Sequence, residues 1–572
     1  MTAEDAENKS DKAPVDKETA EEMPPTYDEA NPLTSGEPNV KITSNETKIE
    51  IGKEKEKEAF EGLTKEELMK YANDPFWVRL RWILFILFWL VWLGMLAASI
   101  VIIIYADKCP SPEPKEWWQK NAMYKVDVPE FGDGTLAGLK ENLDILVESG
   151  VGTIYLTSFV QTATPGTRDD VTDYKSIDSN IGSLAEWKSL VAAIKERDQK
   201  VVIDFIPNHT SEHHAWFEQS VAKDGKFKDY YIWLEGSSSP NASAWSYNDE
   251  RGAWYLHRQG PGRPDLNLAN KDVIRDLEKI IEFWMETGVN GFVVNDVEIL
   301  VDNVDTTETL ESILTKFRDV VNAETENTGV PHVLMTAPVD KAEQAANYYG
   351  DGLTEVGAGN LVQLPLYTQQ IAQPSDATAL KQQLDQFISS LPANAWPNYG
   401  FQSDTAGPDM IDAMNMLKMM LPGTPLFTPG DELGIAWSTD EARSQLDQED
   451  SHLRVFSSLA SKMRHQESIL FGELNKNTSF VMDNVFGITR VKKGNPGYLL
   501  LINMGADDTT VDVSCVQLVP ASIRLMTRSV EETPEDGEEV KRFDSKSVLV
   551  KAREGRVFTF VPTYEENCKK TE

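Results

Sequence analysis

The chain has 572 residues, and at roughly 150 residues per domain this length allows about three or four domains. Apolar residues make up 41% of the sequence, enough for a sizeable buried core, so wholesale disorder is excluded. The formal net charge is −37, and a chain this acidic repels phosphate backbones, so nucleic-acid binding is not expected. Three cysteines are too few for a disulfide scaffold, and their odd number leaves at least one without an internal partner.

The N-terminal tail, residues 1–75, is acidic, rich in Glu, Lys, Pro and Thr and poor in aromatic residues, a composition that predicts disorder. Within it, the motif Pro24-Pro25-Thr26-Tyr27 matches the polyproline-type ligands of WW domains. The motif predicts recruitment of a WW-domain ubiquitin ligase that acts on the lysines of the tail. The alternative is a chance match in a disordered segment.

Residues 82–105 contain no charged side chain. As a helix these 24 residues would be about 36 Å long, enough to cross a hydrocarbon core of about 30 Å. A weak excess of Lys and Arg before the segment places the N-terminus in the cytosol. We therefore predict a single-pass type II membrane protein, with residues 106–572 outside the cell. Gly94 and Ala98 have the small-xxx-small spacing that allows close helix packing.

Glycosylation sequons lie on both sides of this segment. Asn241 and Asn477 follow it and are predicted N-glycosylation sites, whereas Asn8 and Asn45 precede it. Asn208 also lies in a sequon, but we expect it to be too enclosed at the end of a barrel strand to carry a glycan.

Between residues 116 and 470, short apolar runs alternate with helical patterns, which predicts a (β/α)₈ TIM barrel after a linker at 106–115. The eight runs are 122–126, 153–156, 201–205, 291–294, 332–335, 361–366, 395–398 and 424–427. Residues 211–268 form an insertion, and residues 474–563 have the short alternating runs of a C-terminal antiparallel β-sandwich. A polar tail, 564–572, ends the chain. No cofactor and no metal are predicted.

Several of these blocks resemble the α-amylase superfamily of glycoside hydrolases. The stretch beginning at Asp173, DYKSIDSNIGSLAEWKSLVAAIKERDQKVVIDFIPNHTSEHHAWF, is very close to the α-glucosidases of that superfamily, and LPGTPLFTPGDELG resembles its eighth strand and the following loop. The resemblance implies a barrel followed by a C-terminal β domain, as the periodicity also predicts.

The catalytic carboxylates that the resemblance implies are missing. The family places its nucleophile at the end of strand four, where this chain has Asn295. No Glu occurs in residues 333–339, where the acid/base would lie, and Gly400 replaces the third acid. Asp296 is next to Asn295, but adjacent strand residues face opposite ways, so we expect it to point away from the barrel mouth. We therefore predict that the protein is not an enzyme.

Other residues of the family's sugar site are changed or retained. The family's Gly-Tyr-Asp block is Arg168-Asp169-Asp170 in this chain. Asp204, Asn208 and His209 are retained, and they form either a vestigial sugar site or a set of strand-end hydrogen bonds kept for folding. We favour the second interpretation.

The membrane segment and its flanks, WVRLRWILFILFWLVWLGMLAASIVIIIYADKC, look similar to the heavy subunits of the heteromeric amino acid transporters. One uncharged helix cannot line a polar path, so the resemblance implies an ancillary chain that brings a multi-span light-chain amino acid transporter to the plasma membrane and stabilises it there. Cys109, on the oxidising side in a Pro-stiffened link, is the predicted interchain disulfide residue. Cys515 and Cys568 either pair with each other or remain free.

Three alternatives stay open. The chain could be the heavy chain of the cystine and dibasic amino acid transporter, which the long insertion at 211–268 favours. It could also be a membrane-anchored α-glucosidase with unusual catalytic residues. The heavy-chain resemblance further allows an adhesion or signalling role through integrins.

Overall fold

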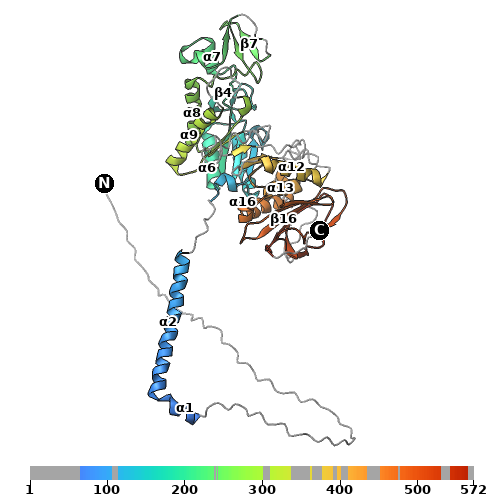
Figure 1. The fold of residues 1–572 in the computed structure, drawn as a ribbon. Helices are drawn as coiled ribbons and strands as arrows, with labels where there is room; N and C mark the ends of the chain where they lie inside the picture. Colours follow the sequence, from blue (N-terminus) through green and yellow to red (C-terminus); the bar gives the residue numbers. More distant parts are fainter. Residues whose placement is uncertain are drawn as a thin grey trace, which may run out of the picture. The chain divides into compact units, whose positions relative to one another are not determined.

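The computed structural model divides the chain into two units, Met1–Cys109 and Pro110–Glu572, shown in Figure 1. It describes residues 65–105, 114–236, 240, 243–299, 310–336, 361–363, 376–390, 396–400, 410–433, 451–474, 477–529 and 542–564.

The first unit contains α1 (Lys65–Ala72) and α2 (Pro75–Tyr105). Helix α2 is long and apolar enough to cross a membrane, and none of its residues is buried. It begins earlier than the uncharged stretch because Asp74 Oδ1 accepts the N–H of Phe76 at 3.0 Å, and Pro75 lacks the N–H that would otherwise need a partner. The Arg81 guanidinium, immediately before the uncharged stretch, donates to the carbonyl of Ala72 at 3.1 Å.

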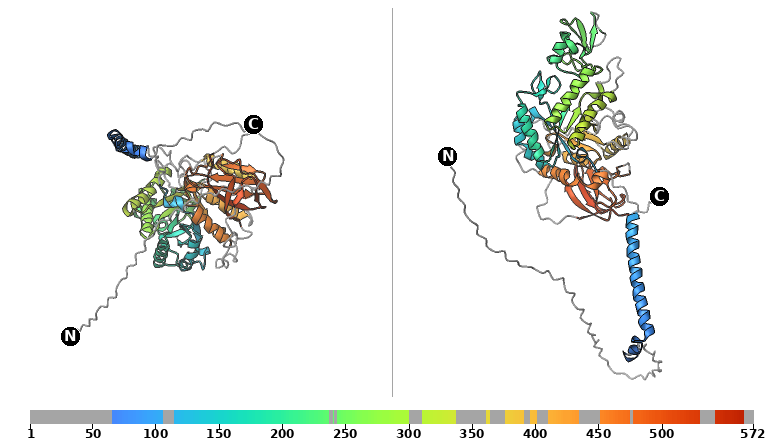
Figure 2. Two further views of the ribbon diagram at one scale, coloured as in Figure 1. Left: turned by 90° about the horizontal axis from the view of Figure 1, so that it is seen from below. Right: turned by 90° about the vertical axis from the view of Figure 1, so that its left-hand side faces the viewer.

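A closed barrel of eight parallel strands forms the centre of the second unit (Figures 1 and 2). Each strand overlaps one of the predicted apolar runs, and neighbours in the barrel are neighbours in the chain order of these strands, which confirms the predicted (β/α)₈ barrel. The strands are β1 (Met123–Asp127), β2 (Thr153–Thr157), β5 (Lys200–Phe205), β9 (Gly291–Val294), β10 (Val333–Thr336), β11 (Leu361–Gln363), β12 (Pro397–Gly400) and β13 (Thr424–Phe427).

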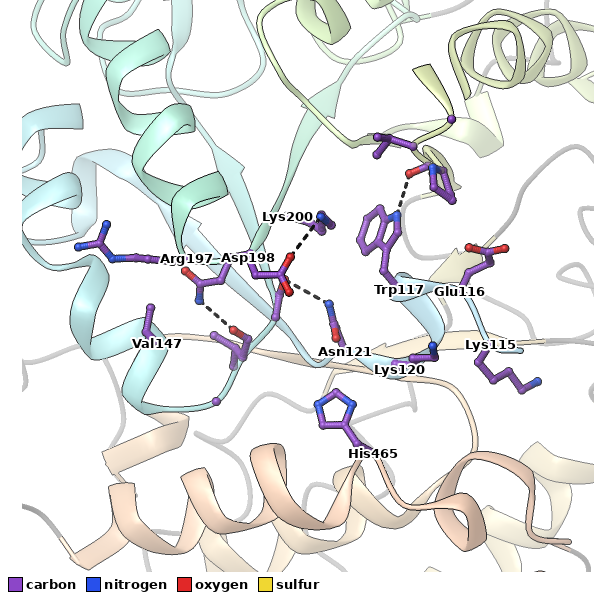
Figure 3. A pocket seen from close by; sticks show the side chains of 17 residues that line it. Lys115, Glu116, Trp117, Lys120, Asn121, Val147, Arg197, Asp198, Lys200 and His465 are labelled. Carbon is purple, nitrogen blue, oxygen red and sulfur yellow. Dashed lines mark hydrogen bonds and ion pairs between the residues drawn. The ribbon is translucent and has the colours of Figure 1, made fainter. Parts of the chain in front are cut away.

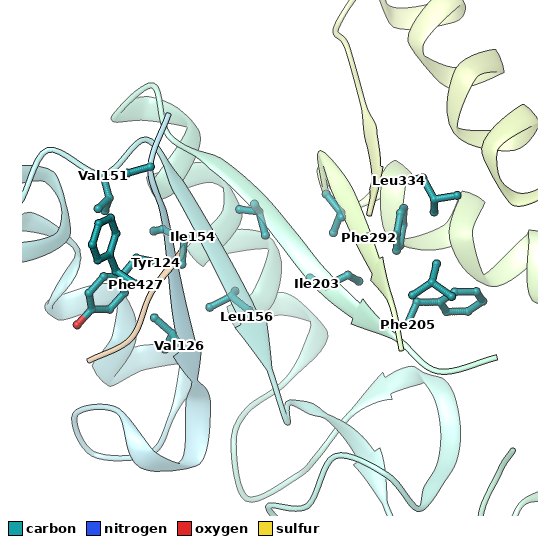
Figure 4. Close-up of a cluster of buried hydrophobic side chains, with 14 of the residues drawn as sticks. Tyr124, Val126, Val151, Ile154, Leu156, Ile203, Phe205, Phe292, Leu334 and Phe427 are labelled. Atoms are coloured by element: carbon teal, nitrogen blue, oxygen red, sulfur yellow. The ribbon is translucent and has the colours of Figure 1, made fainter. Parts of the chain in front are cut away.

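Side chains of the barrel strands alternate between two buried clusters. One cluster fills the barrel interior and includes Tyr155, Val202 and Val293. The other packs between the strands and the surrounding helices, as Figure 4 shows for Ile203 and Phe292. Because the period is two, the residues that follow Val202 and Val293 by two positions also face the interior at the carboxyl end of the strands.

Polar side chains cap the N-termini of helices α6 and α8 in the second unit. Ser183 and Glu186 form a capping box on α6, and the side chain of Asn270 caps α8. The helices are α3 (Trp117–Lys120), α4 (Leu136–Glu141), α5 (Leu143–Glu148), α6 (Leu184–Glu196), α7 (Ala215–Val221), α8 (Lys271–Glu286), α9 (Leu310–Thr328), α12 (Ala377–Ser390), α13 (Ile411–Met420), α15 (Ser451–Ser457) and α16 (Glu467–Phe471).

A small lobe leaves the barrel between β5 and α8. It contains α7 and a three-stranded antiparallel sheet of β6 (Trp233–Glu235), β8 (Ala253–Leu256) and β7 (Trp245–Asn248), in that order. Phe217 of α7 stacks on Trp233 and meets the ring edge of Tyr255, so aromatic side chains form the core of the lobe. An antiparallel hairpin, β3 (Val160–Thr162) with β4 (Val171–Ile177), also rises from the barrel.

The C-terminal part is antiparallel, as predicted. A six-stranded sheet has the order β14 (Ser479–Met482), β15 (Val485–Arg490), β16 (Gly497–Asn503), β21 (Gly555–Phe560), β18 (Ser522–Arg528), β19 (Arg542–Asp544), and β17 (Thr509–Val511) pairs with β20 (Val548–Val550). The two sheets share one apolar cluster. Helix α13 packs on β21, where a Cβ at Gly555 would lie 2.9 Å from Cα of Ala413, so glycine permits this close approach.

Candidate functional site at the barrel mouth

Asp204 is the centre of a polar network where the strands of the barrel end. It lies on β5, and its side chain is 8% exposed. One carboxylate oxygen, Oδ1, accepts a hydrogen bond from Asn295 Nδ2 at 2.8 Å and another from the Tyr155 hydroxyl. The other oxygen, Oδ2, lies 3.7 Å from Arg168 Nε. Burial raises the pKa of Asp204, and the positive charge of Arg168 opposes that rise.

Asn295 occupies the position at which the resemblance expects a nucleophile. Its backbone N–H donates to the carbonyl of Phe205 at 2.8 Å, which holds the residue against β5 immediately after β9 ends. Its side-chain amide donates to Asp204, and Asn295 as a whole is 4% exposed. A neutral amide that donates its N–H in this way offers no carboxylate to attack a sugar carbon.

Arg168 lies in the loop of the β3–β4 hairpin and adds a positive charge to the network. Its Nε lies 3.3 Å from Asp169 as well as near Asp204. Burial disfavours the charged guanidinium, but Asp204 and Asp169 outweigh burial and raise the pKa of Arg168, so it stays charged. A small cavity beside it is lined by Arg168, Tyr174 and Asp204.

Asn208 and His209 fasten the insertion lobe to the barrel. Both are fully buried. The N–H of Leu266 donates to the carbonyl of Asn208 at 2.8 Å, and His209 forms a β-bridge with Asp265. Nε2 of His209 lies 2.8 Å from the carbonyl of Asp169, an acceptor, so this nitrogen carries the proton of a neutral ring. Burial lowers the pKa of His209, which keeps the ring neutral. These contacts support the structural interpretation of the retained residues.

The expected orientation of Asp296 is wrong. Strand β9 ends at Val294, and Asp296 has a left-handed backbone with φ of 55°, so strand alternation no longer applies to it. Its Oδ2 lies 4.0 Å from Nδ1 of His209, beside the polar network. Burial raises the pKa of Asp296, and the neighbouring His209 opposes that rise.

The carboxylates around this network each have a cationic or potentially cationic neighbour. Asp169 lies near Arg168 and 3.7 Å from Arg263, and Asp265 binds Arg258 at 2.6 Å. Among the described residues there is no group of three or more His, Cys, Asp or Glu side chains arranged to hold a metal ion. These ion pairs stabilise the end of the barrel. They also leave little unpaired charge on the described surface of the mouth.

The other predicted site residues are distributed over the chain. Gly94 and Ala98 lie four residues apart on α2, and no atom lies within 4 Å of a Cβ built on Gly94. Asn477 is exposed, as a glycan acceptor must be. Cys515 is disulfide-bonded, so its thiol is not free. Outside the described residues lie Pro24, Pro25, Tyr27, Cys109, Asn241 and Cys568.

Two members of the network were not predicted from the sequence as site residues. The sequence shows that Arg168 replaces the glycine of the family's Gly-Tyr-Asp block. Its pairing with Asp204, however, depends on how the β3–β4 hairpin folds over the barrel. Tyr155 lies inside an apolar run, and only the interior-facing register of β2 shows that its hydroxyl reaches Asp204.

Comparisons with known families match two parts of the chain. Residues 104–466 match the family described as alpha amylase, catalytic domain. Residues 46–124 match the family described as solute carrier family 3 member 2 N-terminus. The second match covers the helix α2 and the first residues of the second unit, so the two matches overlap at the junction.

Similar proteins fall into the same two groups. The amino acid transporter heavy chain SLC3A1 of Rattus norvegicus is 29% identical over 430 residues, which cover 66% of this chain and 62% of that protein. The chain therefore spans less than two thirds of the length of this relative. An alpha-glucosidase of Apis mellifera is 24% identical over 540 residues, covering 75% of this chain and 92% of the enzyme.

Solved structures show the same fold. The trehalulose synthase MutB from Pseudomonas mesoacidophila MX-45 superimposes with a TM-score of 0.64 at 17% identity, covering 78% of this chain and 100% of the enzyme. At this identity the likeness shows the barrel architecture alone. The chain belongs to the alpha-amylase catalytic-domain family, and its N-terminal part is similar to the N-terminus of solute carrier family 3 member 2.

Proposed function

We propose that the protein is an ancillary heavy chain that pairs with a multi-span light-chain amino acid transporter, brings it to the plasma membrane and stabilises it there. The observation that carries this proposal is the combination of one membrane-length helix with a barrel whose nucleophile position is an amide bonded to Asp204. A single helix with no charge after Arg81 offers no polar path for an amino acid, so transport requires a partner.

The proposal includes a type II topology with α2 as the membrane anchor. The cytosolic part is the acidic tail, residues 1–75, and the outer part is a linker at 106–115, the barrel at 116–470 and a β-sandwich at 474–563. Asn477 is exposed, which fits the proposed glycosylation of this sequon on the outer side.

The proposed link to the partner has a covalent and a non-covalent part. Cys109 forms the interchain disulfide, and Gly94 with Ala98 forms a helix surface on which a transporter helix packs closely. The disulfide-bonded state of Cys515 fits this division, because Cys568 is then available as its partner within the chain and Cys109 is left over.

We propose that the barrel has no glycosidase activity. The relationship to alpha-glucosidases explains the fold, but Asn295 and Arg168 leave the described mouth without a free nucleophile beside Asp204. The enzyme alternative is therefore less favoured than the heavy-chain function, and a sugar-release assay decides between them.

The direct test is affinity purification of the full-length chain from cell membranes without reductant. The expected result is a high-mass band that contains this chain and a multi-span transporter, and a loss of amino acid uptake when the chain is depleted. Recovery of the chain alone, with uptake unchanged, would contradict the proposal. In the same preparations, Tyr27→Ala tests the tail motif, because it should remove any WW-domain ubiquitin ligase that co-purifies.

A further inference from the structure

A groove opens at the amino ends of the barrel strands, at the opposite end of the barrel from Asp204. Its volume is about 650 Å³, within the range of about 300–1,000 Å³ typical of ligand sites. Lys200, the first residue of β5, and Gly152, immediately before β2, line it (Figure 3). We call it the basal groove and define it by six of its lining residues: Trp117, Lys120, Val147, Lys200, Val330 and His465.

The wall of the basal groove is positively charged, although the chain as a whole is strongly acidic. Four Lys or Arg side chains line it but only two carboxylates. Arg197 is paired with Asp144 at 2.7 Å, and Lys200 lies 3.9 Å from Asp198. Lys120 forms no salt bridge among the described residues. The groove therefore has an excess of positive charge, and Lys120 is the cation in it that lacks a counter-charge.

His465 adds a titratable ring near Lys120. Burial lowers the pKa of His465, and the positive charges of Arg464 and Lys120 lower it further. Because both neighbours are cations, a negative charge placed between the ring and Lys120 would reduce their repulsion and would favour the protonated ring. This corner of the groove is thus suited to an anionic group.

The part of the wall that carries His465 has an uncommon backbone form. A π-helical segment, Ser458–Met463, ends two residues before His465. A Cβ built on Gly150 would lie 3.1 Å from the backbone nitrogen of Ser461, so the loop after α5 packs tightly against this segment. Short π-helical segments occur frequently at functional sites. The tight packing holds the backbone that presents His465 to the groove.

The groove also exposes apolar side chains. Val147, at the end of α5, is 41% exposed, and Val330, before β10, is 39% exposed. The ring of Trp117 is half-buried, and its Nε1 donates to the carbonyl of Pro331 at 2.7 Å, which fixes the ring in the wall. Contact with an apolar group would remove the surface of these three side chains from water.

Charge and apolar surface together select one class of ligand. The excess of positive charge disfavours metal cations and protonated amines. A neutral sugar would leave Lys120 without a counter-charge, and sulfate or phosphate would leave the apolar side chains unused. An organic molecule that carries an acidic group beside an aromatic or aliphatic body would use both parts of the wall.

We propose that the basal groove binds a small organic anion. The acidic group of this ligand lies between Lys120 and His465, and its apolar body lies against Trp117, Val147 and Val330. The site is distinct from the polar network at the barrel mouth, and it requires neither the proposed heavy-chain function nor a partner protein.

The first test is photo-labelling of the full-length chain in lipid nanodiscs with 4-benzoylbenzoate, an aromatic acid that crosslinks on irradiation. Mass spectrometry should find the label on peptides that contain the lining residues of the groove, and the neutral relative 4-methylbenzophenone should label them much less. Excess 1-naphthalenesulfonate should block this labelling, whereas the same concentration of sulfate should not. Equal labelling by the neutral probe, equal competition by sulfate, or label found only outside the groove would overturn the inference.

The second test measures the same labelling in variants of the groove. Lys120→Glu should lower it about tenfold because the charge is reversed, and Lys120→Arg should keep it. Lys188→Glu, on the exposed face of α6, is the matched control and should leave it unchanged. The double variant V147S/V330S keeps every charge and should lower labelling about threefold through the lost apolar contact.

Thermal unfolding of each variant is measured alongside, so that loss of labelling is read only from chains that unfold at the parent temperature. If Lys120→Glu does not fold, V147S/V330S and the competition by 1-naphthalenesulfonate still decide. Equal labelling of Lys120→Glu and Lys188→Glu, or unchanged labelling of a folded V147S/V330S, would refute the proposed site.

Discussion

Arg168 Nε lies 3.7 Å from Asp204 Oδ2, and this ion pair joins the β3–β4 hairpin to strand β5 of the barrel. The other oxygen of the same carboxylate is held by Asn295 and Tyr155. A carboxylate that is buried, paired with a cation and hydrogen-bonded on its second oxygen is stabilised in one position.

The first prediction concerns Asn295. Asn295→Asp places a second carboxylate about 3 Å from Asp204, removes a hydrogen-bond donor and introduces like-charge repulsion in a buried site. We expect the free energy of unfolding of the full-length chain to fall by roughly 1–3 kcal/mol, measured by thermal and denaturant unfolding in detergent.

The matched control is the double variant D204N/N295D, which exchanges the carboxylate and the amide. It restores one donor and one acceptor and should recover most of the lost stability. None of these proteins should hydrolyse maltose or aryl glucosides, because no Glu follows strand β10 in residues 333–339. Sugar release by Asn295→Asp, or no recovery in the double variant, would contradict this account of the mouth.

The second prediction concerns Glu432, which is fully buried. Burial raises the pKa of Glu432 from its ordinary 4.5 to about 7, while the Tyr124 hydroxyl, donating to Oε1 at 2.6 Å, lowers it. Between pH 4.5 and 7 the folded chain therefore binds more protons here than the unfolded chain, so the free energy of unfolding falls as the pH rises through this window. Glu432→Gln should remove that part of the pH dependence, measured as the difference between the two unfolding profiles.

Tyr124→Phe provides the control for Glu432. It removes a hydrogen bond that favours the carboxylate, so the pKa of Glu432 should rise further and the window of falling stability should extend above pH 7. Parallel profiles of the parent and Glu432→Gln between pH 4.5 and 7 would show that Glu432 does not titrate there.

The third prediction concerns the buried ion pair of Lys418 and Asp431. Lys418 Nζ lies 3.0 Å from Asp431 Oδ2, and both side chains are at most 1% exposed. Lys418→Met would leave the carboxylate of Asp431 buried without its cation and should cost roughly 3–5 kcal/mol of unfolding free energy. The double variant K418M/D431N contains no uncompensated charge and should lose less. An equal loss in both variants would indicate that packing, rather than charge, determines the effect.

The fourth prediction concerns glycosylation. Asn477 is exposed, whereas Asn208 is fully buried and its carbonyl is hydrogen-bonded to Leu266. Asn477→Gln should therefore remove one glycosidase-sensitive step from the apparent mass, and Asn208→Gln should remove none. A glycan at Asn208 would require the end of β5 to be unfolded when the sugar is added, and an unmodified Asn477 would argue against the outer location of this β region.

The barrel was predictable from the sequence because eight short apolar runs alternate with helical patterns. Two of the runs, 291–294 and 424–427, coincide with β9 and β13. The start of α2 was missed because the helix begins at Pro75, before the uncharged stretch, where the Asp74 side chain accepts the N–H of Phe76. Hydropathy alone does not report such a cap.

The candidate site was predictable only in part. Asn295 and Asp204 followed from strand register and from the family pattern. The pairing of Arg168 with Asp204 joins a hairpin loop to a strand of the barrel, and the position of Asp296 depends on a left-handed backbone after β9. No periodicity or residue spacing in the sequence predicts either contact, because both depend on the path of loops in three dimensions.

The last prediction concerns Cys109, which lies four residues after the end of α2 in a Pro-rich link. Because Cys515 is disulfide-bonded and the chain has three cysteines, only one of Cys109 and Cys568 remains for a partner protein. We expect Cys109→Ser to abolish the covalent heterodimer on a non-reducing gel, whereas Cys568→Ser should leave it intact and free the thiol of Cys515 for alkylation. Transporter recovery in mild detergent should persist in Cys109→Ser, since the proposed helix packing on Gly94 and Ala98 is unchanged. A high-mass band that survives Cys109→Ser and disappears with Cys568→Ser would reverse the assignment and place the intrachain disulfide between Cys109 and Cys515.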